Sequence, residues 1–150
     1  MESITVPAKL DRMDETLSWI DTRMETAGFD KKPRSNILLA AEEVFVNIAS
    51  YAYADGEGSV TVSFKRTETG AQIEFTDDGA PYDPLSKDDP DVTLEAEERQ
   101  IGGLGIYLVK KLMDGVNYRH EGGKNILTIQ KNLSDEDEHR IKADRSQLRG

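Results

Sequence analysis

The chain has 150 residues, enough for one domain with a buried core, and its 29 acidic against 19 basic residues give a formal net charge of −10, which argues against non-specific nucleic-acid binding. It contains no cysteine, which excludes disulfides, thiol catalysis and thiolate metal sites. The N-terminus lacks the basic start and apolar core of a signal peptide, and no apolar run approaches the roughly 20 residues that span a bilayer, so we expect a cytoplasmic protein without a membrane partner.

The first third of the chain predicts a short strand and two helices. Residues 3–6 favour a strand that Pro7 ends. Residues 9–27 carry apolar side chains at steps of three and four and are followed by Gly28, a pattern typical of an amphipathic helix. The strongest helix pattern covers residues 33–54, where a proline suits the first turn and a wide apolar face follows.

A β-hairpin and a long polar segment come next. Residues 59–67 and 71–77 alternate between apolar and polar side chains around a turn at Gly70, which predicts a hairpin. Residues 79–100 then carry three prolines and many acidic side chains with little periodicity. This segment is too long for an ordinary connection in a compact domain, and it is typical of a lid or a binding loop.

The last part of the chain predicts a third helix and a second hairpin. Residues 104–114 return to helical spacing, and residues 116–121 and 125–131 form two strands around Gly122 and Gly123. Strands that return by hairpins, with helices on one face, predict an α+β fold, a two-layer sandwich with a mixed, mostly antiparallel sheet. We expect one domain over residues 1–132 and a highly charged tail over 133–150, either a frayed helix or disordered.

The second helix carries a pair of polar residues on one face. Glu43 and Asn47 are four residues apart and therefore one helical turn apart. Asparagine is a mediocre residue for a helix interior. Its carboxamide oxygen can bind Mg²⁺ beside phosphates, and Glu43 could accept a proton from an attacking hydroxyl or water. The alternative is a polar stripe at the boundary of the core, with Asn47 bonded to a loop.

Asp77 and Gly79 follow the first hairpin. A carboxylate at a strand end can accept a hydrogen bond from the exocyclic amine of adenine, and Gly79 would let a planar base approach without a Cβ clash. The alternative is a simple Asp-Gly turn. Pro81 and Pro84 stiffen the exit from this segment and make an ordinary hairpin turn less favourable.

Two further features are weaker. The cluster Gly102, Gly103, Leu104, Gly105 opens into a helix, and backbone amides at a helix N-terminus can bind an anion, although a flexible hinge is an equally good reading. The cluster is followed by no Gly-Lys-Ser/Thr, so it is not a Walker loop. Thr128 on the last strand could reach a base or a water, although threonine is also common in strands for its β-propensity.

Together these motifs, in this order, resemble the GHKL superfamily of ATP-binding domains, and within it the anti-sigma-factor serine/threonine kinases of bacteria. AAEEVFVNIASYAY resembles the family's N-box, DDGAPYDP its adenine-site motif, GGLGIYLVKKLMD its phosphate-side glycine motif and NILTIQK its closing strand. The resemblance covers about residues 5–131. It implies the Bergerat-type ATP-binding fold with an ATP lid.

The resemblance also implies a role for each matching position. Asn47 would bind Mg²⁺ and Glu43 would be the catalytic base. Asp77 would hold the adenine amine, Gly79 would line the base, and Thr128 would lie behind it. The phosphate side would comprise a glycine cluster and one basic residue ahead of it: Gly102, Gly103, Leu104, Gly105 and Arg99.

The function implied by the resemblance is an ATP-dependent serine/threonine protein kinase that acts as an anti-sigma regulatory factor. Its partners would be a STAS-domain anti-sigma-factor antagonist as substrate, a sigma factor, and a second copy of the chain in a homodimer. One alternative is an ATP-holding partner-switching module with little or no kinase activity. Another is an ATPase fragment of a larger machine, which the short chain without a transducer domain disfavours. No phosphoacceptor histidine motif is present, which separates the chain from sensor histidine kinases.

Overall fold

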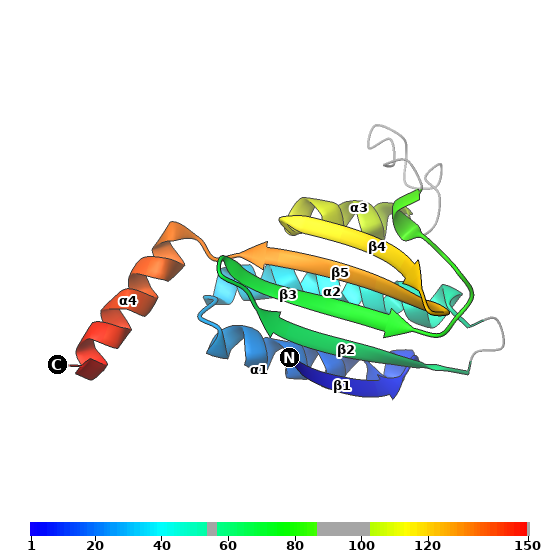
Figure 1. Cartoon of the computed structure of the whole chain (residues 1–150), viewed down its shortest axis with the longest axis horizontal. Helices are drawn as coiled ribbons and strands as arrows, with labels where there is room; N and C mark the ends of the chain where they lie inside the picture. Colours follow the sequence, from blue (N-terminus) through cyan, green and yellow to red (C-terminus); the bar gives the residue numbers. More distant parts are fainter. Residues whose placement is uncertain (54–56, 87–102, 150) are drawn as a thin grey trace.

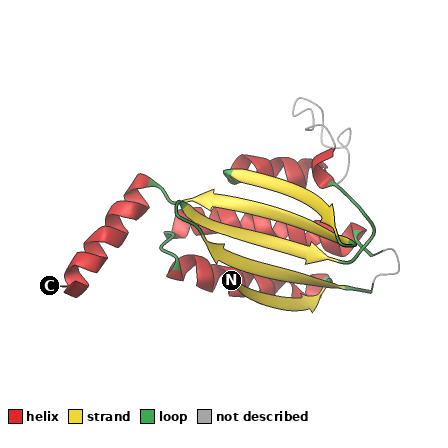
Figure 2. Ribbon diagram, viewed as in Figure 1, coloured by secondary structure: helices red, strands yellow, loops and turns green. Residues whose placement is uncertain are grey.

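The computed structural model describes residues 1–53, 57–86 and 103–149, and it places them as a β-sheet with helices packed on one face (Figures 1 and 2). The predicted α+β order is confirmed. The elements in chain order are β1 (Glu2–Pro7), the short 3-10 helix η1 (Leu10–Arg12), α1 (Met13–Thr26), α2 (Lys31–Tyr51), β2 (Ser59–Arg66), β3 (Gly70–Asp77), the 3-10 helix η2 (Pro84–Ser86), α3 (Gly103–Leu112), β4 (Gly115–Glu121), β5 (Lys124–Asn132) and α4 (Asp135–Arg149). Most of the segment expected to form a lid lies outside the described residues.

The sheet has the strand order β1-β2-β3-β5-β4. Every neighbouring pair of these described strands is antiparallel, including β3 and β5, which a long stretch of chain separates. The register sets Asp77 opposite Val60 on one side and opposite Asn125 on the other. This pairing brings the end of the first hairpin next to the start of the last strand.

Both predicted hairpins form. In the second, Glu121 pairs with Lys124, so Gly122 and Gly123 make a two-residue turn. Their φ angles are 59° and 77°, and a turn of this type needs positive φ at both central positions, which glycine adopts without strain.

The core lies between the sheet and the helices. Side chains at alternate strand positions face the helices, for example Val60 and Val62 on β2 and Ile73 and Phe75 on β3. Asp30 caps the N-terminus of α2, where its carboxylate accepts a hydrogen bond from the Lys31 N–H at 2.9 Å. The buried face of α2 consists of Ile37, Ala40, Ala41, Val44 and Phe45.

The apolar residues of helix α3 and of the position that follows it differ in burial. Ile106, Val109 and Met113 are buried, whereas Tyr107 and Leu108 are only half-buried. Nearly every residue of this helix is apolar, so periodicity alone does not distinguish its inner face.

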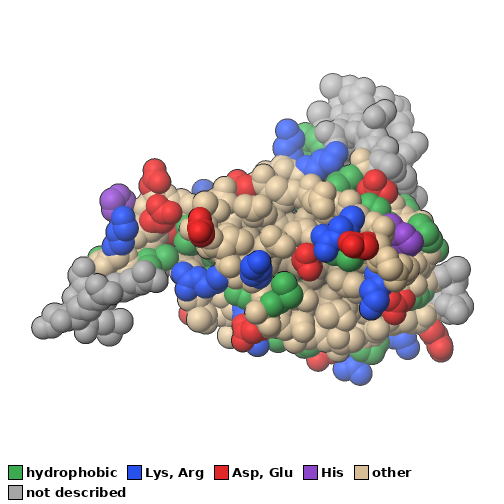
Figure 3. Space-filling model, viewed as in Figure 1, with side chains coloured by type: hydrophobic (Ala, Val, Ile, Leu, Met, Phe, Trp, Pro, Cys, Tyr) green, Lys and Arg blue, Asp and Glu red, His purple; other side chains and the backbone are tan. Residues whose placement is uncertain are grey.

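None of the described helices packs on the opposite face of the sheet, which Figure 3 shows as mostly uncharged surface with scattered basic, acidic and hydrophobic side chains. Thr5 and Thr61 share a hydrogen bond there at 2.8 Å. Glu74 on β3 accepts a hydrogen bond from the Thr128 hydroxyl at 3.4 Å and lies 3.7 Å from the Arg119 guanidinium. Alternate residues of each strand therefore face solvent on this side and the core on the other.

The charged tail forms helix α4, which extends away from the sheet and its helices (Figure 1). Ser134 and Asp137 form a reciprocal cap, in which the Asp137 N–H donates to the Ser134 hydroxyl and the Ser134 N–H donates to the Asp137 carboxylate. Ile141 lies against Gly28, next to the end of α1. None of the helices in the described ranges combines the length and apolar composition that a bilayer crossing demands.

Candidate functional site

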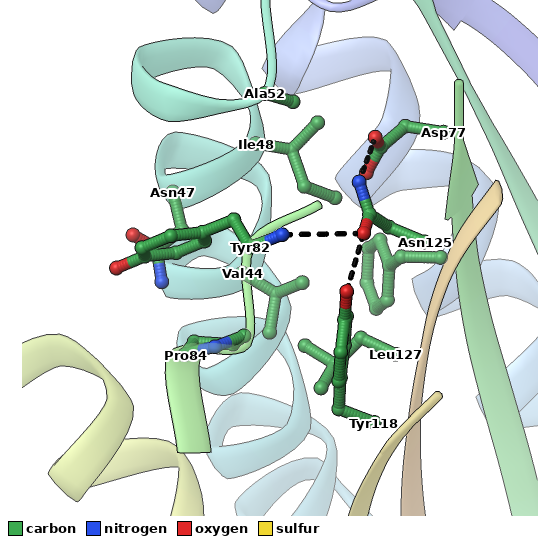
Figure 4. A pocket seen from close by; sticks show the side chains of 11 residues that line it. Val44, Asn47, Ile48, Ala52, Asp77, Tyr82, Pro84, Tyr118, Asn125 and Leu127 are labelled. Atoms are coloured by element: carbon green, nitrogen blue, oxygen red, sulfur yellow. Dashed lines mark hydrogen bonds between the residues drawn. The ribbon is translucent and has the colours of Figure 1, made fainter. Parts of the chain in front are cut away.

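A small cavity lies between α2 and one end of the sheet (Figure 4). Its volume is about 30 Å³, which is room for little more than a water molecule. One wall belongs to α2, another to β3, β4 and β5, and a third to the segment that leads into η2. The lining residues are Val44, Asn47, Ile48, Ala52, Phe75, Asp77, Tyr82, Pro84, Tyr118, Asn125 and Leu127.

Asn47 reaches the cavity because it lies three residues after Val44, on the same face of α2, and Ile48, four residues after Val44, lines the cavity too. Its side chain is half-buried, and within the described part of the chain it makes no hydrogen bond. The alternative that a loop binds this amide is therefore not seen among these residues. Its carboxamide oxygen is available to a hard cation such as Mg²⁺.

Glu43 lies one turn earlier on α2 and packs against the first turn of α3. A Cβ atom added to Gly105 would collide with the Glu43 Oε2 atom, so this glycine allows the close approach of α3 to the carboxylate. Burial raises the pKa of Glu43 above its ordinary value, and the negative charge of Glu42 acts in the same direction. A carboxylate with a raised pKa is a better general base near neutral pH. Glu43 is not, however, one of the residues that line the cavity.

Asp77, at the end of β3, is 5% exposed and lines the cavity. Its Oδ1 atom accepts two hydrogen bonds at 2.9 Å, from the Gly79 N–H and from Nδ2 of Asn125. In the described ranges its Oδ2 atom accepts none. One oxygen is thus held by the protein, and the other is left to accept a hydrogen bond from an amine such as that of adenine.

Gly79 is required for a contact that sequence reasoning did not foresee. A Cβ atom at this position would lie 2.6 Å from the carbonyl carbon of Ala52 at the end of α2, and 2.8 Å from the Ala52 Cβ. The next residue, Ala80, donates its N–H to the Ala52 oxygen at 2.9 Å. Gly79 therefore lets the segment after β3 pack on α2, and its place beside a base stays a prediction.

Asn125 and Tyr118 also line the cavity, although sequence reasoning missed them. Asn125 is 5% exposed and binds the Asp77 carboxylate, while the Tyr118 hydroxyl donates to the Asn125 Oδ1 atom. A signal was present in the sequence. Asn125 has the same strand parity as the buried Leu127 and Ile129, and an amide on the core-facing side of a strand requires an explanation.

Tyr82 narrows the cavity. Its ring stacks on that of Tyr51 at the end of α2, with centroids 5.6 Å apart and planes 28° from parallel. In the view of Figure 4 the Tyr82 ring overlaps the Asn47 side chain, and Pro84 lies on the same side of the cavity. Tyr82 and Pro84 thus form the part of the cavity wall that the segment after β3 contributes.

The position of Thr128 contradicts its predicted place behind the base. Its hydroxyl donates to Glu74 on the helix-free face of the sheet, and Thr128 does not line the cavity. Successive strand residues face opposite sides, so Leu127 reaches the cavity and Thr128 cannot.

The phosphate-side predictions remain open. Arg99 and Gly102 lie outside the described residues, and the side chain of Leu104 is not described. Gly103 is the first residue of α3, and Gly105 lies in its first turn. The described residues contain no group of three or more His, Asp or Glu side chains that could hold a metal ion. A magnesium ion at Asn47 would therefore take its other oxygen ligands from phosphate and water.

Comparison with known proteins gives a consistent result. Residues 6–131 match the histidine kinase-like ATPase domain family. The chain is 26% identical over 116 residues to the serine/threonine-protein kinase BtrW of Bordetella bronchiseptica, covering 77% of this chain and 82% of that protein. It is 30% identical over 116 residues to the serine-protein kinase RsbW of Bacillus cereus, covering 75% of this chain and 71% of the relative.

A solved structure shares the fold. The crystal structure of the RsbU and RsbW domains of a Mycobacterium tuberculosis protein superimposes with a TM-score of 0.57 at 14% sequence identity. The match covers 89% of this chain and 35% of the longer one. This likeness confirms the α+β fold that the sequence predicted.

Proposed function

The chain belongs to the family of histidine kinase-like ATPase domains, and from this membership we propose that it is a serine/threonine protein kinase that transfers the γ-phosphate of ATP to a partner protein. The relative at 26% identity is named a serine/threonine-protein kinase, and the one at 30% identity a serine-protein kinase. We propose further that it acts in the cytoplasm as an anti-sigma regulatory factor. Its substrate would be a STAS-type antagonist and its other partners a sigma factor and a second copy of the chain.

One observation carries the proposal: motifs far apart in the sequence meet at one end of the sheet. Asn47 and Asp77 line the same cavity, and Glu43, one turn before Asn47, lies against Gly105 of α3. This arrangement offers an acceptor for an adenine amine on Asp77 and an oxygen ligand for a cation on Asn47. It also offers a carboxylate with a raised pKa, Glu43, beside the first turn of α3. Phosphoryl transfer depends mainly on such positioning and on charge neutralisation.

Three residues would have separate roles in the transfer of phosphate from ATP. Asp77 would accept a hydrogen bond from the adenine amine through Oδ2. Asn47 would hold Mg²⁺, which supplies positive charge against the phosphates when bound. Glu43 would orient the attacking serine or threonine hydroxyl and accept its proton. Because the pKa of Glu43 is raised, this carboxylate would be protonated, and transfer would decline, at a higher pH than for a glutamate with an ordinary pKa.

The test is a transfer assay with labelled ATP, Mg²⁺ and candidate STAS proteins. We expect the unmodified chain to label one of them. Glu43→Gln should keep ATP affinity and lower transfer by about 10²- to 10⁴-fold, the usual contribution of a general base. Asn47→Ala should weaken magnesium-dependent ATP binding. Glu42→Gln is the matched control, since it removes a neighbouring carboxylate without removing the proposed base.

A second function, an ATP-holding partner-switching module without catalysis, is favoured by one observation. Glu43 does not line the cavity, and its carboxylate lies against Gly105 in the first turn of α3. If a STAS protein binds the chain tightly in the presence of ATP and no label is transferred, the kinase proposal fails and the module remains.

A further inference from the structure

We propose that Asn125 is a positioning residue that sets Asp77 for nucleobase binding, and that the Tyr118 hydroxyl holds the Asn125 amide in the required orientation. The inference rests on the proposed adenine-nucleotide site. It assigns a role to Asn125, which the sequence analysis left without one although it begins the NILTIQK motif, and to Tyr118, which lies outside the motifs.

The place of Asn125 in the sheet is unusual for its chemistry. It stands opposite Asp77 in the β3–β5 register, on the face that Leu127 and Ile129 turn to the core. It is 5% exposed. Burying an amide costs free energy unless its donors and acceptors are bonded, so a buried asparagine on an apolar strand face must be held by specific partners.

The amide nitrogen binds the two parts of the chain that shape this end of the cavity. Nδ2 donates to Oδ1 of Asp77 and to the Ala80 oxygen, each at 2.9 Å, and approaches the Gly79 oxygen at 3.3 Å. Since Oδ1 of Asp77 also accepts the Gly79 N–H, this oxygen is occupied by the protein. The carboxylate is thereby held in one orientation, with Oδ2 left for a ligand.

The amide oxygen fixes the orientation of the Asn125 side chain. Oδ1 accepts the Tyr82 N–H at 3.4 Å and the Tyr118 hydroxyl. A backbone N–H can only donate, so a flipped amide would lose this bond and would also set its oxygen against two carbonyl oxygens. Burial raises the pKa of the Tyr118 hydroxyl, which therefore remains a donor at neutral pH.

The Asn125 amide thus binds both Asp77, the proposed acceptor for the base, and the segment that follows β3. Residues 79–82 are held to β5 by the bonds that also orient Asp77. An isosteric carboxyl at position 125 would remove the donor to Asp77 and place a second negative charge beside it. Two adjacent carboxyls share a proton, so one of them titrates at a raised pKa.

The decisive variant is Asn125→Asp, studied in the full chain by calorimetric titration with ATP and with GTP across the acid-to-neutral range. We expect ATP binding about ten- to hundredfold weaker at neutral pH, as for a lost hydrogen bond to a charged group. Acidification should restore part of this loss, because a protonated carboxyl can again donate to Asp77. The ratio of ATP to GTP affinity should fall, since an unfixed Asp77 discriminates less. The titratable groups around the site are Asp77, Asp78, Asp83, Tyr53, Tyr82, Tyr118, His120 and Lys124.

Asn117→Asp is the matched control. Asn117 lies exposed on β4 and pairs with Thr128 on the helix-free side, so the same substitution adds the same charge away from the cavity. It should leave ATP affinity and its pH dependence unchanged. Tyr118→Phe is the milder second variant. It keeps the ring and removes only the hydroxyl, and we expect about three- to tenfold weaker ATP binding with unchanged circular dichroism.

The outcomes separate this inference from the proposed function. If the unmodified chain does not bind ATP, the proposed function fails. If it binds ATP but Tyr118→Phe binds equally well, or Asn125→Asp loses the same affinity at every pH, Asn125 has only a structural role and the inference is overturned. If Asn125→Asp does not fold, the ATP affinity of Tyr118→Phe decides.

Discussion

Gly79→Ala tests whether this glycine serves the fold or the ligand. The added Cβ would overlap the carbonyl group of Ala52, with the carbonyl carbon 2.6 Å away. This neighbour is backbone at the end of α2, so it cannot swing aside as a flexible side chain would. The segment after β3 must then lift from α2 and lose the Ala80 N–H bond to the Ala52 oxygen.

The expected cost follows from these two contacts. Overpacking in a well-packed region costs about 1–3 kcal/mol, and a lost hydrogen bond about 0.5–1.5 kcal/mol, so the free energy of unfolding should fall by about 1.5–4.5 kcal/mol. For a domain of this size 1 kcal/mol lowers Tm by about 2–4 °C, which gives a drop of roughly 3–18 °C. The measurement is a thermal melt without nucleotide, followed by circular dichroism.

Gly115→Ala is the matched control. A Cβ atom there would lie 3.6 Å from the Gln130 Cβ, an ordinary van der Waals contact, so we expect little change in Tm. If Gly79→Ala melts like the unmodified chain without nucleotide but binds ATP more weakly, the glycine is required by the base and not by α2. That result would refute the packing argument.

Three further predictions concern the site and the sheet. Glu43→Gln should raise the Tm at neutral pH, because burial penalises the ionised carboxylate in the folded state. This difference in Tm should vanish in acid, below the pKa that the Glu43 carboxyl has in the unfolded chain, and thermal melts at several pH values check this. Gly105→Ala should fold, since the displaced atom is the end of a side chain, but it should lower transfer by about tenfold or more in the labelled-ATP assay by shifting Glu43. Thr128→Val should keep its ATP affinity by calorimetry, because its hydroxyl bonds Glu74 on the other face; a clear loss would contradict that placement.

Local patterns were enough for most elements of the fold. The apolar face of α2 and the alternation of β2 and β3 repeat over several turns or strand residues, so their type follows from the period alone. The two glycines at 122 and 123 similarly predict a tight turn between strands. Helix α3 shows the limit, because a helix that is apolar on nearly all sides has no period from which to read its inner face.

The candidate site could be predicted only in part. Glu43, Asn47 and Asp77 were proposed from chemistry and motif order, and the structure brings them to one end of the sheet. Thr128 was chosen for its hydroxyl, although its strand parity turns it to the opposite face from Leu127 and Asn125.

The sequence by itself determined the order of the elements, the two hairpins and the positions of the polar residues within them, because these depend on neighbours a few residues apart. Tertiary structure alone decided that Asn125 meets Asp77, that Gly79 meets Ala52 and that Gly105 meets Glu43. Each of these contacts joins separate elements and depends on strand register or helix packing. A slip of one residue in β5 would turn Thr128 to the cavity and Asn125 to solvent without changing any local pattern, and only the burial of the common core selects between the two.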